Sequence, residues 1–310
     1  AQRVADPDGA LRAILQVARR DAAAVRAAAA DAGAWRALWD LVGASDGFAE
    51  FYLRHPDELV HLSGAGLTVP DEQSMRAELL DSVGDVDGFA SDASDAAWVA
   101  LRVRYRRLLA RIAAYDLGQD DPAGAIDVVS AALADIAGAA LEASLSVARA
   151  RVSAPGPGAF PREQVEATRF AIIAMGKTGA RELNYVSDVD VIFVGGTSDD
   201  EVVSEARAID IGTRLAVQTM RGISGPEIEP PLWEVDPNLR PEGKQGALVR
   251  SLASHQQYYD RWAKSWEFQA LLKARAIAGD PALGAEYVAA VQPLVWHSAA
   301  RENFVEGVQR

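Results

Sequence analysis

The sequence contains no cysteine in its 310 residues. Disulfides, zinc sites built on thiolates and cysteine nucleophiles are therefore excluded, and the chain is compatible with a reducing cytoplasm. No Gly-x-Ser-x-Gly elbow of a serine hydrolase is present. The few histidines show no metal-ligand spacing, so we interpret all four as structural: His55, His61, His255 and His297.

Basic residues and long apolar runs are also scarce. Acidic residues outnumber basic ones by 44 to 31, and the formal net charge is −13. Such a surface repels nucleic-acid backbones, so we expect no nucleic-acid partner, although a local pocket for one nucleotide is compatible with this charge. We find no window with the apolar length of a membrane span and expect no membrane partner. The chain starts without an initiator methionine or a signal peptide and ends within a helix-like pattern at 303–310, so we expect a segment of a longer polypeptide.

Helical patterns dominate the first half of the chain. Apolar residues recur at helical spacing from about residue 9 to residue 150, including an alanine-rich stretch over 121–151. A loop rich in proline and glycine follows at 153–158, and the pattern then changes. We predict four short strands, at 170–175, 189–194, 232–236 and 247–250. We also predict a helix over 200–221 and helices from residue 251 to the end.

This order predicts an α+β fold, in which a small mixed sheet is flanked by large all-helical segments. We divide the chain into an N-terminal helical region (1–152), a domain built around the predicted sheet (153–280) and the start of a C-terminal helical region (281–310). No candidate catalytic group lies in the first region. We interpret its arginine cluster as a solvated face, made of Arg102, Arg104, Arg106, Arg107 and Arg111.

Two aspartates, Asp188 and Asp190, open the second predicted strand. Side chains two apart on a strand share a face, so both carboxylates point the same way. Neighbouring carboxylates repel each other unless a cation lies between them, and hard oxygen ligands suit Mg²⁺ or Mn²⁺. Such a metal neutralises phosphates and aligns the attacking and leaving oxygens of a displacement at phosphorus. The alternative is a turn or an exposed strand edge, but aspartate is depleted in strands.

Three further residues could complete such a site. Asp236 ends the third predicted strand, where the alternative is an ordinary strand-end aspartate before a turn. Arg240 follows it and could bind phosphate through two N–H groups. Lys273 lies seven residues after Trp266, which places both on one face of a predicted helix. The alternative for this pair is a core aromatic and a solvated base.

Gly176 and Gly179 follow the first predicted strand, where glycine lets backbone amides approach a phosphate. Gly176-Lys177-Thr178 also matches the tail of a P-loop. That pattern needs a further glycine at position 171, where the chain has Ala171 inside the predicted strand. A P-loop ATPase is therefore the weaker alternative.

Three blocks carry a resemblance to a known family: Gly176–Phe193, Val235–Gly243 and Tyr258–Arg275. Together with Arg54-His55-Pro56 they resemble the glutamine synthetase adenylyltransferase/adenylyl-removing enzymes, occur in that family's order and span most of the chain. These enzymes are bifunctional, with two nucleotidyltransferase domains in tandem, of which this chain holds one. The segments 182–184 (Glu-Leu-Asn) and 233–236 (Trp-Glu-Val-Asp) look more like the N-terminal, adenylyl-removing half.

The resemblance implies a polymerase beta-like nucleotidyltransferase fold and a phosphorolysis reaction. Inorganic phosphate attacks the phosphorus of an AMP group on a tyrosine of adenylylated glutamine synthetase, and ADP and free tyrosine result. Asp188, Asp190 and Asp236 would be catalytic and hold Mg²⁺ (or Mn²⁺). The residues that would bind nucleotide or phosphate are Gly176, Gly179, Ser187, Arg240 and Lys273. Where the family often has a second glycine the chain has Ala180, which adds a methyl group near the phosphate.

The implied partners are adenylylated glutamine synthetase, phosphate and the nucleotides ADP and AMP, with a PII-type signalling protein as regulator. The implied setting is the cytoplasm, in the control of nitrogen assimilation. Two alternatives stay open, namely adenylyl transfer from ATP to glutamine synthetase and a catalytically silent regulatory module.

Overall fold

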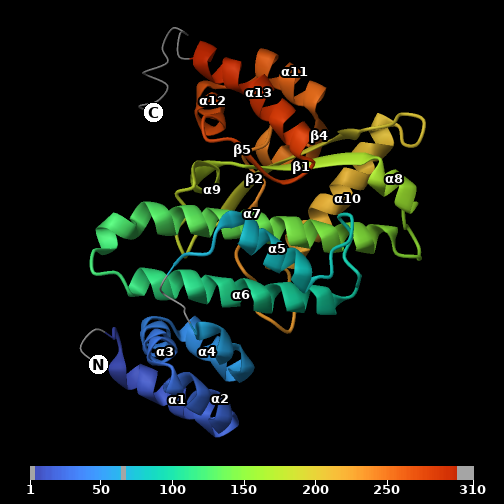
Figure 1. The fold of residues 1–310 in the computed structure, drawn as a ribbon. Helices are drawn as coiled ribbons and strands as arrows, with labels where there is room; N and C mark the ends of the chain where they lie inside the picture. Colours follow the sequence, from blue (N-terminus) through green and yellow to red (C-terminus); the bar gives the residue numbers. More distant parts are fainter. Residues whose placement is uncertain (1–3, 64–67, 299–310) are drawn as a thin grey trace. The chain divides into compact units, whose positions relative to one another are not determined.

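The protein is described by a computed structural model that covers residues 4–63 and 68–298 (Figure 1). It is mostly helical and has one five-stranded sheet of mixed direction, which confirms the predicted α+β fold. Two compact units divide the chain, residues 1–75 with 103–133 and residues 76–102 with 134–310. The three-part division expected from the sequence stays a prediction. The side chain of His297 and the helix-like pattern at 303–310 lie outside the described residues.

The first unit begins with short helices, the first three of which start at an aspartate cap. These are α1 (Pro7–Arg20), α2 (Ala22–Ala30), α3 (Ala32–Ala44), α4 (Asp46–Arg54) and the 3₁₀ helix η1 (Pro56–Leu62). The carboxylates of Asp6, Asp21 and Asp31 accept the first N–H groups of α1, α2 and α3. Leu38, Leu41 and other apolar side chains form their common core.

Three helices connect this region to the sheet: α5 (Glu72–Ser82), α6 (Asp95–Leu117) and α7 (Pro122–Ser153). The expectation that no window reaches the apolarity of a membrane span is wrong for α7, which has an 18-residue window of mean hydropathy 1.6. Of that window, 67% is buried within the protein. Its alanine-rich composition therefore fits a core helix, and among the described residues no other helix meets the same test.

The second unit is built around the sheet. Its strands are β1 (Thr168–Ala174), β2 (Val189–Thr197), β3 (Val235–Asp236), β4 (Val249–Ser251) and β5 (Arg275–Gly279). The order is β3-β2-β1-β5, with β4 also paired to β2. β1 runs antiparallel to β2 and β5, whereas β3 and β4 run parallel to β2.

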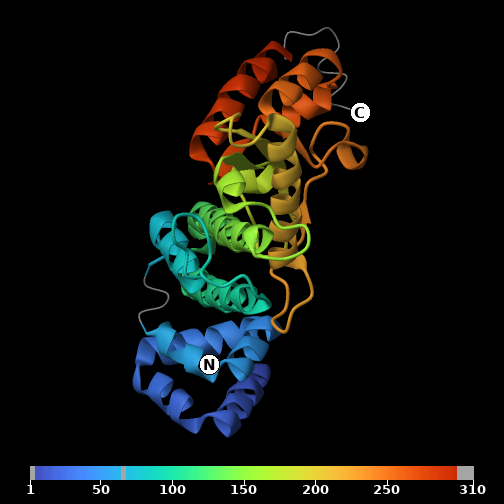
Figure 2. The same cartoon turned by 90° about the vertical axis from the view of Figure 1, so that its right-hand side faces the viewer.

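Helices cover both faces of this sheet. They are α8 (Arg162–Glu166), α9 (Gly176–Ala180), α10 (Glu205–Ser224), α11 (Leu252–Arg261), α12 (Ser265–Leu271) and α13 (Pro281–Ser298), with the 3₁₀ turn η2 (Gly243–Gln245). Ile173 and Ile192 pack against α11, α12 and α13 on one face. Gly212 of α10 packs against Phe170, which points to the other face. In Figure 2 the red and orange helices lie above the yellow-green strands.

Several predicted elements need correction. Residues 275–279 form strand β5, where a helix was predicted. Of the strand predicted at 232–236, only residues 235–236 form a strand. Arg102 is fully buried and does not belong to a solvated face. Its guanidinium donates hydrogen bonds to the carbonyl oxygens of Gly222 (2.8 and 3.0 Å), Gly225 (2.8 Å) and Glu229 (2.7 Å). Gly222 and Gly225 lie at the C-terminal end of α10, where the last carbonyls of a helix have no partner within the helix.

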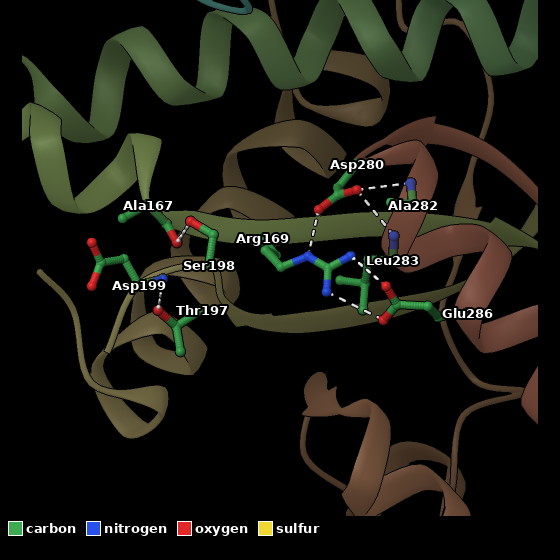
Figure 3. A network of polar contacts seen from close by, with 9 residues as sticks. All are labelled: Ala167, Arg169, Thr197, Ser198, Asp199, Asp280, Ala282, Leu283 and Glu286. Atoms are coloured by element: carbon green, nitrogen blue, oxygen red, sulfur yellow. Dashed lines mark hydrogen bonds and ion pairs between the residues drawn. The ribbon is translucent and has the colours of Figure 1, made fainter. Parts of the chain in front are cut away.

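A network of charged groups fixes α13 to β1 (Figure 3). Arg169 of β1 donates its Nε–H to Asp280 (2.7 Å) and its two terminal nitrogens to Glu286 (3.0 and 3.2 Å). The second oxygen of Asp280 caps α13 by accepting the N–H groups of Ala282 (2.8 Å) and Leu283 (3.0 Å). One carboxylate thus starts the helix and also ties it to the sheet.

Candidate active site

Four chain segments meet at one edge of the sheet. Ala174, at the end of β1, pairs with Val191 near the start of β2 and with Arg275 at the start of β5. β3 lies beside the start of β2 because it pairs with β2 in parallel register there. The candidate catalytic aspartates, at β2 and β3, therefore lie at the same edge as the end of β1 and the start of β5.

Asp188, Asp190 and Asp236 come together at this edge. One carboxylate oxygen from each lies within 4.8 Å of the others. Asp190 and Asp236 are direct neighbours across the β2–β3 pair. Asp188 lies directly before β2, which starts at Val189 as the predicted strand did. Three hard oxygen ligands at this separation fit a divalent cation such as Mg²⁺ or Mn²⁺.

The electrostatics of Asp190 agree with that fit. Its half-burial raises the pKa of the carboxyl, the charges of Asp188 and Asp236 raise it further, and Lys177 opposes the shift. Asp236 is oriented by the backbone N–H of Asn238, which it accepts at 2.7 Å. The cluster is thus a site of concentrated negative charge that a cation would relieve.

Gly176 makes room for this cluster. It has φ +52°, and a Cβ atom there would lie 2.5 Å from the Oδ2 atom of Asp190. The N–H of the preceding Met175 donates to the carbonyl oxygen of Asp190 at 2.9 Å. Glycine is needed because any side chain would displace the carboxylate. Binding of phosphate by Gly176 stays a prediction.

Gly179 lies in a short helix, α9, and not in an open loop. It is buried, and a Cβ atom there would overlap the carbonyl oxygen of Lys273. Its missing side chain therefore allows the turn before β5 to approach α9 closely. Ala180, the departure from the family pattern, is half-buried at the end of α9.

The two basic candidates have partners of their own. Lys273 lies after the end of α12, in the turn before β5, so the helical face expected for Trp266 and Lys273 is wrong. Its ammonium donates to Glu182 at 2.7 Å. Arg240 is buried and donates to the carbonyl oxygens of Pro237 (2.8 Å) and Gly246 (3.2 Å), so it braces the segment that follows Asp236.

Ser187 is half-buried, and its hydroxyl lies 3.4 Å from the Oδ1 atom of Asp188. The P-loop alternative fails, because Ala171 lies inside β1 and pairs with Val194 and Gly279. Sequence reasoning gave no role to Lys177, whose charge acts on Asp190. Its position directly after Gly176 was the one sequence feature that could have indicated this role.

Comparison with known proteins agrees with this geometry. The family model of glutamate-ammonia ligase adenylyltransferase matches residues 35–290. The bifunctional glutamine synthetase adenylyltransferase/adenylyl-removing enzyme of Leifsonia xyli subsp. xyli is 59% identical over 314 residues, which cover 99% of this chain and 30% of the relative. The proteins of the same name from Streptomyces coelicolor and Mycobacterium tuberculosis are 46% and 40% identical, and each match covers 99% of this chain and 29% of the relative.

The chain thus spans about 30% of the length of the curated relatives that it matches. The family match extends over most of the chain, from α3 through the aspartate cluster and β5 into α13. The chain belongs to the glutamate-ammonia ligase adenylyltransferase family, a family of nucleotidyltransferases.

Proposed function

We propose that this domain removes AMP from a tyrosine of adenylylated glutamine synthetase by metal-dependent phosphorolysis, giving ADP and active glutamine synthetase. The observation that carries the proposal is the convergence of Asp188, Asp190 and Asp236 within 4.8 Å. The direction rests on the resemblance of segments 182–184 and 233–236 to the adenylyl-removing half. The proposal makes a PII-type signalling protein the regulator and the cytoplasm the compartment.

The three aspartates would hold Mg²⁺ or Mn²⁺, which would neutralise the oxygens of the reacting phosphorus and of the incoming phosphate. Asp236 keeps its orientation through the N–H of Asn238, and Gly176 leaves space for Asp190. The tyrosine oxygen that leaves has an ordinary pKa of about 10, so its departure needs no strong general acid.

Charge for the incoming phosphate would come from Lys273. Its side chain is 43% exposed, and its backbone lies against Gly179, beside the aspartate edge. Ser187 would approach the phosphate from the segment before Asp188. Arg240 would act mainly by holding the segment after Asp236 in place, since its donors already bind the carbonyl oxygens of Pro237 and Gly246.

The alternative reaction, adenylyl transfer from ATP, would use the same groups. There the tyrosine oxygen attacks the α-phosphorus of ATP and pyrophosphate leaves, and similar negative charge develops at the phosphorus. The acceptor pocket must therefore decide between phosphate and tyrosine. The relatives' name contains both activities, so the assay has to separate them.

A two-arm assay makes this separation. In one arm the protein, Mg²⁺ and phosphate are incubated with adenylylated glutamine synthetase; in the other, the protein and labelled ATP are incubated with the unmodified form. We expect phosphate-dependent ADP release in the first arm and little label transfer in the second. Label transfer without ADP release would contradict the proposed direction, and inactivity in both arms despite metal binding would indicate a silent module. Asp188→Asn is the inactive control.

A further inference from the structure

Helix α7 contacts β5 along one face. Asp135, Gly138 and Glu142 are three and four residues apart and therefore share that face. In the middle, Gly138 allows close packing, since a Cβ atom there would lie 3.3 Å from the Cβ of Ile277. At the end of β5 far from the aspartates, Glu142 accepts the N–H of Gly279 at 2.7 Å.

Asp135 occupies the other end of this contact, at the aspartate edge. Its side chain is 4% exposed and it accepts two hydrogen bonds from Arg181, one at 3.1 Å from Nε and one from Nη2. The Nη1 atom of Arg275 lies 3.8 Å from the same carboxylate. One buried negative charge thus pairs with two arginines that follow α9 and start β5.

Both arginines act on the end of α9. Arg275 donates to the carbonyl oxygens of Gly179 (3.2 Å) and Thr178 (3.0 Å), which close the helix. Arg181 caps α9 in the left-handed conformation, with φ 60°, which is costly for a residue other than glycine. The ion pair with Asp135 offsets that cost and stabilises this conformation.

The opposite end of α9 is the active site. α9 starts at Gly176, whose backbone lies against the carboxylate of Asp190, and the chain after Arg181 leads to Ser187 and Asp188. A shift at the end of α9 therefore moves the helix against one metal ligand and loosens the segment that carries another.

We propose that Asp135 is a positioning residue of this active site. By pairing with Arg181 and Arg275 it holds α9 and the segment 181–188 in the arrangement in which Asp188 and Asp190 converge. The inference rests on the proposed function, and it brings a residue of the N-terminal helical region into the catalytic machinery.

The structure provides a matched control in Glu142. Asp135→Asn and Glu142→Gln each replace a carboxylate of α7, 4% exposed in Asp135 and 12% exposed in Glu142, by an amide of the same shape. Each removes an arginine ion pair, since Glu142 binds Arg76 at 2.6 Å. The two sites lie at opposite ends of β5. A general loss of α7 packing should affect both variants alike.

The test measures the melting temperature, the kinetics of ADP release and backbone amide exchange over residues 176–188 for the protein and both variants. We expect both variants to melt earlier, whereas only Asp135→Asn loses about tenfold or more in kcat/KM, since a displacement of about 1 Å at a catalytic group can cost that much. We also expect faster exchange over 176–188 only in Asp135→Asn.

Equal activity and equal exchange in the two variants would overturn the inference. If Asp135→Asn does not fold, Arg181→Gln removes the same pair from its 48% exposed side and should show the same selective loss. Amide exchange keeps this test separate from the proposed function, because it reports the order of α9 even if the protein releases no ADP. Absence of ADP release by the unsubstituted protein would instead contradict phosphorolysis itself.

Discussion

Removing the charge of Asp190 should make the metal-free protein more stable. In the absence of a cation, its carboxylate lies within 4.8 Å of those of Asp188 and Asp236 and is half-buried. The change Asp190→Asn keeps the shape of the side chain and removes both repulsions. The same change removes a ligand, so we expect the stabilisation by added Mg²⁺ or Mn²⁺ to be lost.

The size of the effect follows from the separation. Two unit charges 4.8 Å apart repel each other by about 1 kcal/mol in water and by about 3.5 kcal/mol at an effective dielectric constant of about 20. Asp190 is half-buried and Lys177 offsets part of the repulsion, so we expect a gain of about 1–3 kcal/mol in unfolding free energy. This corresponds to a rise in melting temperature of about 2–4 °C per kcal/mol.

The sign depends on pH. Because burial and the charges of Asp188 and Asp236 raise the pKa of Asp190, the folded state binds this proton more readily than the unfolded state. The destabilisation is therefore present at neutral pH. It decreases as the pH falls through the folded pKa and is lost below the unfolded pKa of about 3.9, where the carboxyl is neutral in both states and the two proteins should melt together.

Thermal unfolding with a chelator and with Mg²⁺ measures both effects. Asp200→Asn serves as the matched control, because it makes the same charge change at an exposed side chain. A lower melting temperature for Asp190→Asn in the chelator, or an unchanged shift with Mg²⁺, would refute the reasoning.

Two further changes test other parts of the structure. Gly176→Ala should weaken Mn²⁺ binding about tenfold or more, because the new Cβ atom meets the carboxylate of Asp190, and titration calorimetry measures this. It should also destabilise the fold by about 1–2 kcal/mol in urea unfolding, because residue 176 has φ +52°. Asp280→Asn should lower the unfolding free energy at pH 7 by about 1–2 kcal/mol. Burial alone would raise the pKa of Asp280, but the hydrogen bonds from Arg169 and from the start of α13 lower it below its ordinary value. The stability that ionised Asp280 provides is therefore present above the unfolded pKa of about 3.9 and is lost as the pH falls through the folded pKa.

These two predictions have clear contrary results. Gly156→Ala is the control for Gly176, since a Cβ atom at Gly156 would meet nothing within 4 Å. Equal Mn²⁺ affinity for both alanine variants would show that Gly176 does not shape the aspartate cluster. For Asp280, a stability difference that stays constant between pH 7 and pH 2 would show that its ionised form does not support α13.

The aspartate cluster was predictable from the sequence because its signals are local. Asp188 and Asp190 border a β-branched strand, and a polar residue at that place needs a reason. The long apolar strands β1 and β2 were recognised for the same reason. Asp236 lies beside these two aspartates because β3 pairs with β2 and places it opposite Asp190. The sequence alone could not establish this pairing without the resemblance.

The rest of the site depends on contacts between distant residues. β5 contains two alanines around Ile277, with little intrinsic preference for a strand, and it is a strand because it pairs with β1. Asp135 lies in an alanine-rich helix and pairs with Arg181, 46 residues later. Arg102 bonds carbonyl oxygens 120 residues or more away, so its burial had no local signal in a segment rich in arginine.

The path of labelled phosphate tests the central claim most directly. Adenylylated glutamine synthetase is incubated with this protein, Mg²⁺ and ³²P-labelled inorganic phosphate, and the nucleotides released are separated. If phosphate attacks the phosphorus of the AMP group, the label appears as the β-phosphate of ADP, in an amount equal to the AMP lost from the substrate, and Asp188→Asn releases none. Release of unlabelled AMP, or retention of the AMP group by a protein that binds the metal, would contradict phosphorolysis at the site of Asp188, Asp190 and Asp236.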